Sequence, residues 1–463
     1  MLAQRPPSLL HIDMQLVASL VVMGECRTLQ MLHSLVPRTG HEPEDWKVKC
    51  ISIRKRAHSF YKRLAAFEYR YLILELNLMG KNPKGAVIPV LNLKGQYQAL
   101  QDEIQLAIQK VLSTQSFILG ENVAALEEEI AQYCGVAYGV GVASGTDALL
   151  LALKAAGVGP GDEVIVPAFS FVATADVVGL LGAVPVFVDI DPASYTIDVS
   201  QVKASITPNT RAVIPVHLYG QPANMAELLT ICEEHGLTLI GDTAQALGAD
   251  YHESPVCSFG DFGCISFFPS KNLGAYGDGG MIVVKQKEQA DLLKKLRSHG
   301  SSVKYCSEIQ GWNSRLDEIQ AAILRVKLPY LDQWNLIRAE HAAMYNQILG
   351  DVDGLIIPKT MSDRTHVFHQ YTVRVPNRDA VRAMMLESGI ETAVHYPIPL
   401  HLQPMYRSLG YRRGDLPVAE KAAEEVLSLP VYPELEDSQI ERISLALRAA
   451  VESQVEVLLP IEA

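Results

Sequence analysis

The sequence lacks three things: a long uncharged apolar run, a regular cysteine pattern and an excess of positive charge. No stretch of about 18 or more apolar residues occurs, which argues against a membrane-spanning helix. The seven cysteines contain no Cys-x-x-Cys pair, so neither a metal site nor a disulfide framework is indicated, and a reduced cytoplasmic setting fits best. The net charge of -12 argues against nucleic-acid binding, because phosphate contacts need clustered cations.

The first part of the chain carries two features that resemble targeting or binding segments. Residues Met14–Met23 are apolar, but they are too short to span a membrane and follow a weakly charged start, so secretion is not favoured. Trp46–Met79 is typical of a basic, aromatic-rich helix that could touch a phosphate polymer or an anionic membrane. The favoured interpretation is a solvated helix face beside an aromatic packing face.

The length of 463 residues exceeds one ordinary domain and predicts three parts. A cluster of turn formers at Gly80–Gly85 marks a break. We expect residues 1–87 to be an N-terminal extension of unknown role that is partly helical. We expect 88–330 to form a large α/β domain that includes an N-terminal helical segment, and 331–463 to form a smaller α+β domain.

Short β-branched runs alternate with helical patterns from Val164 onward, as the βα units of a parallel sheet require. The expected strands are Glu163–Pro167, Pro185–Asp189, Ala212–His217, Leu237–Gly241, Cys264–Phe268 and Met281–Val284. The expected helices between them are Ala173–Leu181 and Asn224–His235. In the second domain we expect a helix from Leu331 to Tyr345, strands near His366–Val375 and a helix over Asp379–Ser388.

A turn of small residues at Gly141–Asp147 leads into the helical run Ala148–Ala156. Backbone N–H groups at a helix start, unhindered at Gly145, form a natural phosphate site. The alternative is a purely structural helix cap, because many helices begin with Thr or Asp.

Asp242 follows the apolar strand Leu237–Gly241. A carboxylate at the carboxyl end of a parallel strand points into the crevice where α/β sheets bind ligands. If it meets a pyridinium nitrogen, its charge keeps that nitrogen protonated and the ring becomes an electron sink. Its structural alternative is a helix N-cap.

Lys271 lies in a Gly-rich loop between two apolar strands, with Ser266 five residues before it. Such packing would desolvate the amine and lower its pKa, as imine chemistry with an aldehyde requires. The alternative for any single lysine is an ordinary surface position.

Together and in this order, the segments resemble the DegT/StrS type of sugar-nucleotide aminotransferase, among the fold-type I pyridoxal-phosphate (PLP) enzymes. The resemblance covers about Ile88 to Ala450 and rests on Gly161–Pro167, Val188–Pro192, His217–Gly220, Asp242–Ala246, Ser266–Gly274, Asn313–Arg315 and His395–Pro397. It implies a mostly parallel seven-stranded sheet sandwiched by helices, with a smaller C-terminal domain.

The resemblance also implies a role for each matching position around the cofactor ring. Lys271 matches the lysine that carries PLP as an imine and then shuttles a proton. Asp242 matches the partner of the pyridine nitrogen, and Gln245 the residue near the ring hydroxyl. Phe171 matches the aromatic residue that stacks on the ring, with a core phenylalanine as the alternative.

Four further positions match residues around the cofactor phosphate. Gly145, Thr146 and Ser266 match the phosphate cradle. Asn313 matches an asparagine that reaches the phosphate of the neighbouring subunit's cofactor, which implies a homodimer with shared sites; a turn former is the alternative. One departure is Gly241, where the family usually has Glu, so that a neighbouring contact is lost.

The implied activity is transfer of an amino group, from glutamate as the expected donor, to a keto carbon of a nucleotide-linked oxo sugar. The segment His395–His401 resembles family members that act at carbon 3 more than those that act at carbon 4. His395 and Tyr396 are candidates for the substrate site. Two alternatives keep the same fold: a non-catalytic regulatory protein, and a PLP-dependent sugar dehydratase, in which histidine typically replaces Lys271. A nicotinamide dehydrogenase is disfavoured because no G-x-G-x-x-G follows a first strand.

Overall fold

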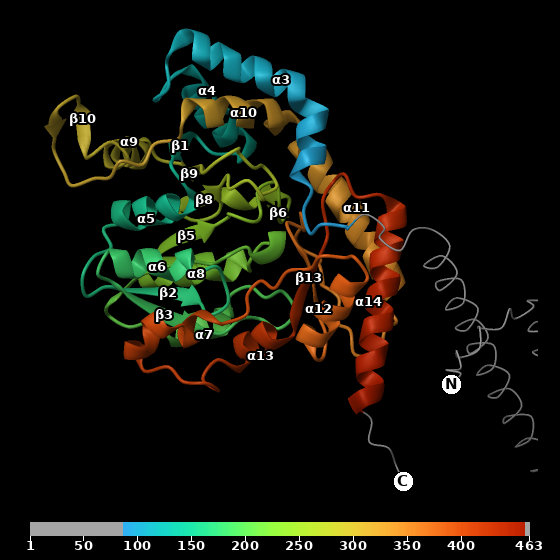
Figure 1. Ribbon diagram of the computed structural model, residues 1–463. Helices are drawn as coiled ribbons and strands as arrows, with labels where there is room; N and C mark the ends of the chain where they lie inside the picture. The colour runs from blue at the N-terminus through green and yellow to red at the C-terminus, as the bar shows by residue number, and fades with distance from the viewer. Residues whose placement is uncertain (1–86, 459–463) are drawn as a thin grey trace, which may run out of the picture. The chain divides into compact units, whose positions relative to one another are not determined.

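Short apolar segments form the sheet at the centre of the protein, whose computed structural model describes residues 87–458. Within these residues the central sheet has seven strands (Figure 1), in the order β1 (Tyr138–Val142), β9 (Gly280–Val284), β8 (Phe262–Ser266), β5 (Thr238–Asp242), β4 (Thr210–Val213), β2 (Glu163–Pro167) and β3 (Val184–Val188). Strands β8, β5, β4, β2 and β3 run parallel, whereas β9 is antiparallel to both β8 and β1. The predicted α/β architecture with a mostly parallel seven-stranded sheet is confirmed.

Both faces of the sheet are buried, because successive side chains of a strand point to opposite sides. In β2, Val164 and Val166 belong to one apolar core, and Ile165 belongs to the other. The helices that accompany these cores are α4 (Glu121–Tyr133), α5 (Gly145–Ala155), α6 (Ala173–Leu180), α7 (Val199–Ala204), α8 (Met225–His235), α9 (Lys287–Leu296), α10 (Glu318–Lys327) and α13 (Pro417–Glu425). The sheet is therefore the middle layer of a sandwich.

A separate apolar core lies in the C-terminal part of the chain, and Ile88 is buried within it. Its elements are α11 (Leu331–Leu349), β12 (Tyr371–Arg374), α12 (Arg378–Glu387), β13 (Val426–Leu429) and α14 (Asp437–Leu458). Figure 1 shows α11, α12 and α14 gathered on one side of the view, while α3 (Leu93–Thr114) lies with α4 and α10 at the top. The proposed division of the chain at residue 330 stays a prediction.

Most predicted elements agree with the structure to within a few residues, and two strands are shorter for visible reasons. The strand expected over Ala212–His217 ends as β4 at Val213, since Pro215 has no amide hydrogen to donate. The strand expected near His366–Val375 is confined to β12, because the Val367 N–H donates to Gly220 O outside any strand.

Some expectations fall on residues that the structure does not describe. These are the apolar segment Met14–Met23, the basic helix Trp46–Met79 and the break at Gly80–Gly85, all of which lie outside residues 87–458. Within the described residues, no helix combines the length and the apolar character needed to cross a bilayer. Short hairpins complete the fold, formed by β6 (Asp250–Tyr251) with β7 (Ser254–Pro255) and by β10 (Ser301–Val303) with β11 (Cys306–Ser307).

Candidate active site

The candidate catalytic residues come from loops at one edge of the sheet. Strands β1, β2, β5 and β8 run in the same direction, so their carboxyl ends meet at this edge, where open α/β sheets bind ligands. Asp242 is the last residue of β5 and Ser266 the last residue of β8. Lys271 follows β8, Phe171 follows β2, and the α5 start at Gly145 follows β1.

Asp242 is a buried carboxylate held by two hydrogen bonds. Its Oδ2 accepts from the Thr174 hydroxyl at 3.0 Å and its Oδ1 from the Ala244 N–H at 3.2 Å. Burial raises the pKa of Asp242, while these two donors and the charge of Lys271 lower it. No helix begins directly after Asp242, since the next element of the described chain is β6, so the helix N-cap alternative fails.

Thr174, on α6, positions the carboxylate of Asp242, and sequence reasoning missed it. Its hydroxyl bridges Asp242 and the Ser170 hydroxyl, which lies 3.0 Å away. Thr174→Val keeps the side-chain shape but removes the donor. We expect kcat to fall about tenfold, since a hydrogen bond to a charged group contributes about 1.5–3 kcal/mol.

The pH profile of the Thr174→Val variant provides a second measurement. Without the donor the pKa of Asp242 rises further, so the acidic limb of kcat against pH should move to higher pH. Thr174→Ser keeps the hydroxyl and is the matched control, expected to retain the wild-type limb. An unchanged limb in Thr174→Val would contradict the role of this hydroxyl.

Lys271 is half-buried, with its N–H bonded to Phe268 O at 2.8 Å in a tight turn. Burial lowers the pKa of its amine to about 8, against an opposing effect of the Asp242 carboxylate. The two side chains therefore lie close enough to shift each other's pKa. The alternative of an ordinary surface lysine fails, because the side chain is half-buried.

The lowered pKa predicts how attachment of PLP to the apoprotein depends on pH. Only the uncharged amine of Lys271 attacks an aldehyde, so the attachment rate should rise about tenfold for each pH unit below about 8 and level off above it. Stopped-flow absorbance measures this rate. In Asp242→Asn the amine loses the charge that raises its pKa, so the midpoint should move to lower pH. A midpoint near the ordinary lysine value of 10.5 would contradict the burial effect.

Gln245 and Tyr396 meet on one side of the site. The Gln245 side chain accepts from the Tyr219 N–H at 2.7 Å and donates to the Tyr396 hydroxyl at 3.2 Å. The Tyr396 ring lies 6.1 Å from the ring of Phe171, centroid to centroid. Phe171 is 54% exposed, so it is not a core phenylalanine and its ring is free to contact a ligand.

His395 lies beside Tyr396 and is held in two ways. Its carbonyl accepts from the Tyr219 hydroxyl, and its Nδ1 lies 3.0 Å from the Ser428 hydroxyl. Burial, together with the charge of Lys271, lowers the pKa of His395 to about 4. The imidazole is therefore neutral at physiological pH and lies within the electrostatic reach of the lysine.

The start of α5 approaches the end of β8 closely enough to require glycine. A Cβ atom on Gly145 would stand 2.6 Å from the Cβ of Ser266. The helix begins at Gly145, three residues before the predicted start, because the Ser144 hydroxyl caps it by accepting from the Asp147 N–H at 3.0 Å. Thr146 follows Gly145 in this first turn. The structure therefore places Gly145 against Ser266, with Thr146 next to Gly145 in the chain.

Asn313 is exposed and adjoins Ser314. Its backbone forms an isolated β-bridge with Ser298. Its neighbour Ser314 is buried and donates to the Asp147 carboxylate at 2.7 Å. The expected reach of Asn313 into a neighbouring subunit stays a prediction.

The loop after Lys271 is clamped by residues that sequence reasoning did not single out. Asn272 donates to Asn335 Oδ1 at 2.7 Å and to Val367 O at 3.1 Å. The fully buried Lys327 donates to Gly274 O at 2.7 Å. Asn272 belongs to the segment Ser266–Gly274 that carries the family resemblance, but nothing local in the sequence identifies its partners.

The predicted loss of a contact at Gly241 has a visible counterpart. The His217 Nδ1 accepts from the Ala223 N–H, so its Nε2 carries the proton, yet this buried atom has no partner in the described residues. A Cβ atom on Gly241 would lie 3.3 Å from it. The missing side chain thus leaves a donor unsatisfied without disturbing Asp242.

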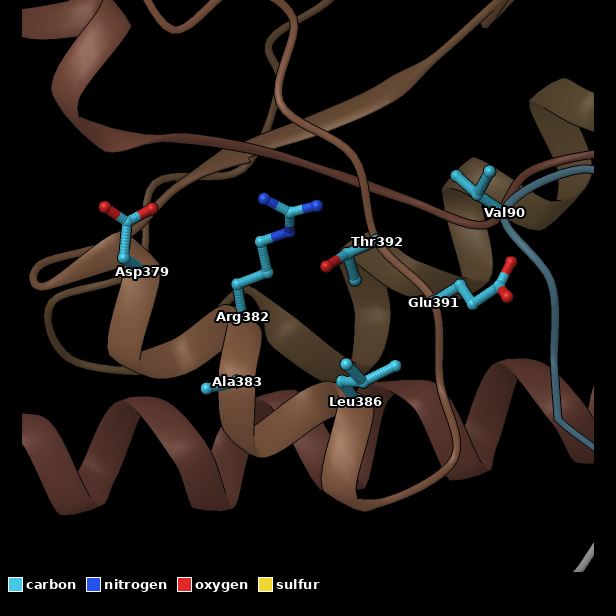
Figure 2. A pocket seen from close by; sticks show the side chains of 7 residues that line it. All are labelled: Val90, Asp379, Arg382, Ala383, Leu386, Glu391 and Thr392. Carbon is cyan, nitrogen blue, oxygen red and sulfur yellow. The ribbon is translucent and has the colours of Figure 1, made fainter.

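A surface hollow of about 530 Å³ lies elsewhere, beside α12. Figure 2 shows the guanidinium of Arg382 extending over this hollow, which is lined by Val90, Asp379, Arg382, Ala383, Leu386, Glu391 and Thr392. None of the residues around Lys271 is among them, so the catalytic candidates do not belong to this hollow.

Comparison with known proteins decides the family. Residues 98–448 match the DegT/DnrJ/EryC1/StrS aminotransferase family. The chain belongs to this aminotransferase family. A "pleiotropic regulatory protein" of Geobacillus stearothermophilus is 52% identical over 354 residues, covering 76% of this chain and 95% of that protein. The UDP-N-acetyl-3-dehydro-alpha-D-glucosamine 3-aminotransferase of Acidithiobacillus ferrooxidans is 49% identical over 365 residues, covering 79% and 98%.

Solved structures of two similar proteins agree with this aminotransferase assignment. DesV of S. venezuelae, solved in complex with a ketimine intermediate, has a TM-score of 0.78 at 44% identity, covering 80% of this chain and 99% of DesV. The ntda protein of Bacillus subtilis, solved with its cofactor PMP, has a TM-score of 0.75 at 32% identity, covering 80% and 87%. The predicted fold-type I architecture is confirmed.

Proposed function

We propose that this aminotransferase uses PLP to move an amino group from glutamate to the keto carbon of a nucleotide-linked oxo sugar. Carbon 3 is the favoured position, for amino-sugar assembly in polysaccharides or secondary metabolites. The observation that carries the proposal is the position of the two residues: the buried Asp242 ends β5, and Lys271 follows the adjacent parallel strand β8. The lowered pKa of the Lys271 amine agrees with this placement. The 3-aminotransferase relative of Acidithiobacillus ferrooxidans supports the sugar class and the carbon.

The residues present fit the cofactor. The N–H groups at the α5 start suit a phosphate, and the close contact of Gly145 with Ser266 leaves no room for a side chain there. When bound, PLP supplies an aldehyde that accepts amines and a ring that withdraws electrons. Gly145, Thr146 and Ser266 would hold the phosphate, and Phe171 would cover the ring.

Two residues would handle protons. The Asp242 carboxylate would hold a proton on the ring nitrogen, and Thr174 favours the ionised form of that carboxylate by donating to it. The Lys271 amine would accept a proton from the substrate carbon and return it, which a pKa of about 8 permits near neutral pH. Gln245, held by Tyr219 and Tyr396, would face the ring hydroxyl.

We also propose that the active unit is a cytoplasmic homodimer. Asn313 is exposed on its own chain, which leaves it free to reach the phosphate site of a second copy. The described cysteines are all free thiols, which supports a reducing compartment. Sedimentation of the purified protein measures the dimer directly.

A substrate panel tests the activity. Purified protein is incubated with glutamate and a set of nucleotide 3-oxo and 4-oxo sugars, and the amino sugar is identified by mass and NMR. Formation of 3-amino products only with Lys271 intact supports the proposal. Turnover of 4-oxo compounds alone would show that the carbon assignment is wrong.

A non-catalytic regulatory role is the second candidate, because the 52% identical relative from Geobacillus stearothermophilus bears a regulatory name. The chemistry of this chain argues against it, since a regulatory protein has no need for a lysine with a lowered pKa. A wild-type protein that stays colourless with PLP would favour the regulatory role. The dehydratase alternative is disfavoured because Lys271 is present rather than histidine.

A further inference from the structure

The first turn of α5 presents backbone donors that are not used within the described chain. The N–H groups of Ser144, Gly145 and Thr146 donate to no acceptor among residues 87–458. Free donors at a helix start, together with the helix dipole, attract anions. An acidic side chain in the same turn would compete with a phosphate for these groups.

Asp147 is that acidic side chain, and its sequence position favours competition. It is the third residue after the Ser144 N-cap, the place from which an acidic side chain can bond back to the N-cap N–H in a capping box. No such bond forms here. The Asp147 Oδ2 instead accepts from the Ser314 hydroxyl at 2.7 Å.

Ser314 is held firmly enough to direct this carboxylate. It is 1% exposed, its hydroxyl accepts from the Ala143 N–H at 3.2 Å, and its own N–H donates to Arg297 O at 2.9 Å. With one lone pair engaged by Ala143, the hydroxyl hydrogen is directed at Asp147. The carboxylate is thereby bonded to Ser314 and not to the helix start.

We propose that Ser314 is a positioning residue for the cofactor phosphate, which it serves by holding the Asp147 carboxylate off the donors of the first turn. This inference rests on the proposed PLP function. Loss of the hydroxyl would free Asp147 to close the capping box, which occupies a donor and places a negative charge beside the phosphate dianion. Affinity for PLP would fall although the helix itself gains a cap.

The test compares Ser314→Ala, Asp147→Asn and the double variant in the full-length protein. Equilibrium titration is expected to give a PLP dissociation constant about tenfold higher in Ser314→Ala than in wild type. The double variant should bind PLP within about threefold of Asp147→Asn, because the competing charge is gone. Inorganic phosphate, titrated as a competitor of PLP, should rank the affinities of the variants in the same order.

Apoprotein melting separates this role from a merely structural one. Ser314→Ala should melt at or above the wild-type temperature, since the freed carboxylate caps α5. If Ser314 had only a structural role, Ser314→Ala would lower the melting temperature, and adding Asp147→Asn would not restore it. Ser444→Ala is the matched control, because Ser444 is also buried but bonds to Ile440 O in α14. Its PLP affinity should stay at the wild-type value.

A second variant leaves Ser314 in place. Asp147→Glu lengthens the side chain so that it reaches the N-cap N–H, and PLP affinity should fall severalfold. Wild-type affinity in both Ser314→Ala and Asp147→Glu, or failure of Asp147→Asn to restore binding, overturns the inference. A wild-type protein that binds no PLP overturns the proposed function instead.

Discussion

Replacing Lys271 by alanine is expected to abolish covalent attachment of PLP and to lower kcat by about 10⁴-fold, the upper end of what a positioned acid–base group contributes. The physical reason is that the Lys271 amine both binds the aldehyde of PLP and transfers the substrate proton. Its pKa of about 8 leaves enough of it uncharged to attack an aldehyde. Borohydride reduction followed by peptide mass analysis measures the attachment, and the substrate panel measures kcat.

Two lysines serve as comparisons for this variant. Lys287 is exposed, and Lys287→Ala should keep both the attachment and the rate. Lys327 also has a pKa lowered to about 8 by burial, but its Nζ is bonded to Gly274 O, so reduction should leave it unlabelled. A Lys271→Ala protein that still retains PLP after reduction, or a label on Lys327, would show that Lys271 is not the attachment point.

Asp242→Asn is expected to lower kcat by roughly 10²–10³-fold while preserving the fold. The amide has the shape of the carboxylate but carries no charge, so it cannot keep a ring nitrogen protonated in a buried site. The PLP dissociation constant should rise as well, because a buried charge-assisted hydrogen bond is lost. Titration and single-turnover kinetics measure the two effects separately.

Asp189→Asn is the matched control for a buried aspartate. Asp189 accepts from the N–H groups of Val418 and Ala419 at 2.9 and 2.7 Å, at the start of α13. Its loss should lower the melting temperature and leave the chemistry of bound PLP intact. If Asp242→Asn keeps more than half of the wild-type kcat, Asp242 is not the residue that keeps the ring nitrogen of PLP protonated.

Parts of this site followed from local patterns in the chain. The apolar strand before Asp242 and the strand before Lys271 predicted that both residues would lie at carboxyl ends, and the parallel sheet brings those ends to one edge. The small-residue turn around Gly145 predicted a tight approach, and the structure places Ser266 against it. These inferences needed only strand direction and residue size.

Other parts could not be read from local patterns. Thr174 meets Asp242 across 68 positions, Gln245 meets Tyr396 across 151, and Ser314 meets Asp147 across 167. Such contacts depend on how helices and loops pack over the sheet, and no spacing rule reports them. The same packing decided that Phe171 would be exposed, a question that its apolar character alone left open.

The sequence by itself determined most strands of the central sheet and the family, and it predicted the roles of the lysine and the carboxylate, because these depend on local periodicity and motif order. Only the tertiary structure decided which groups shift the pKa of Asp242 and the direction in which Asp147 points. The reason is that desolvation and hydrogen bonding act through neighbours distant in the chain, and these neighbours exist only once the chain is folded.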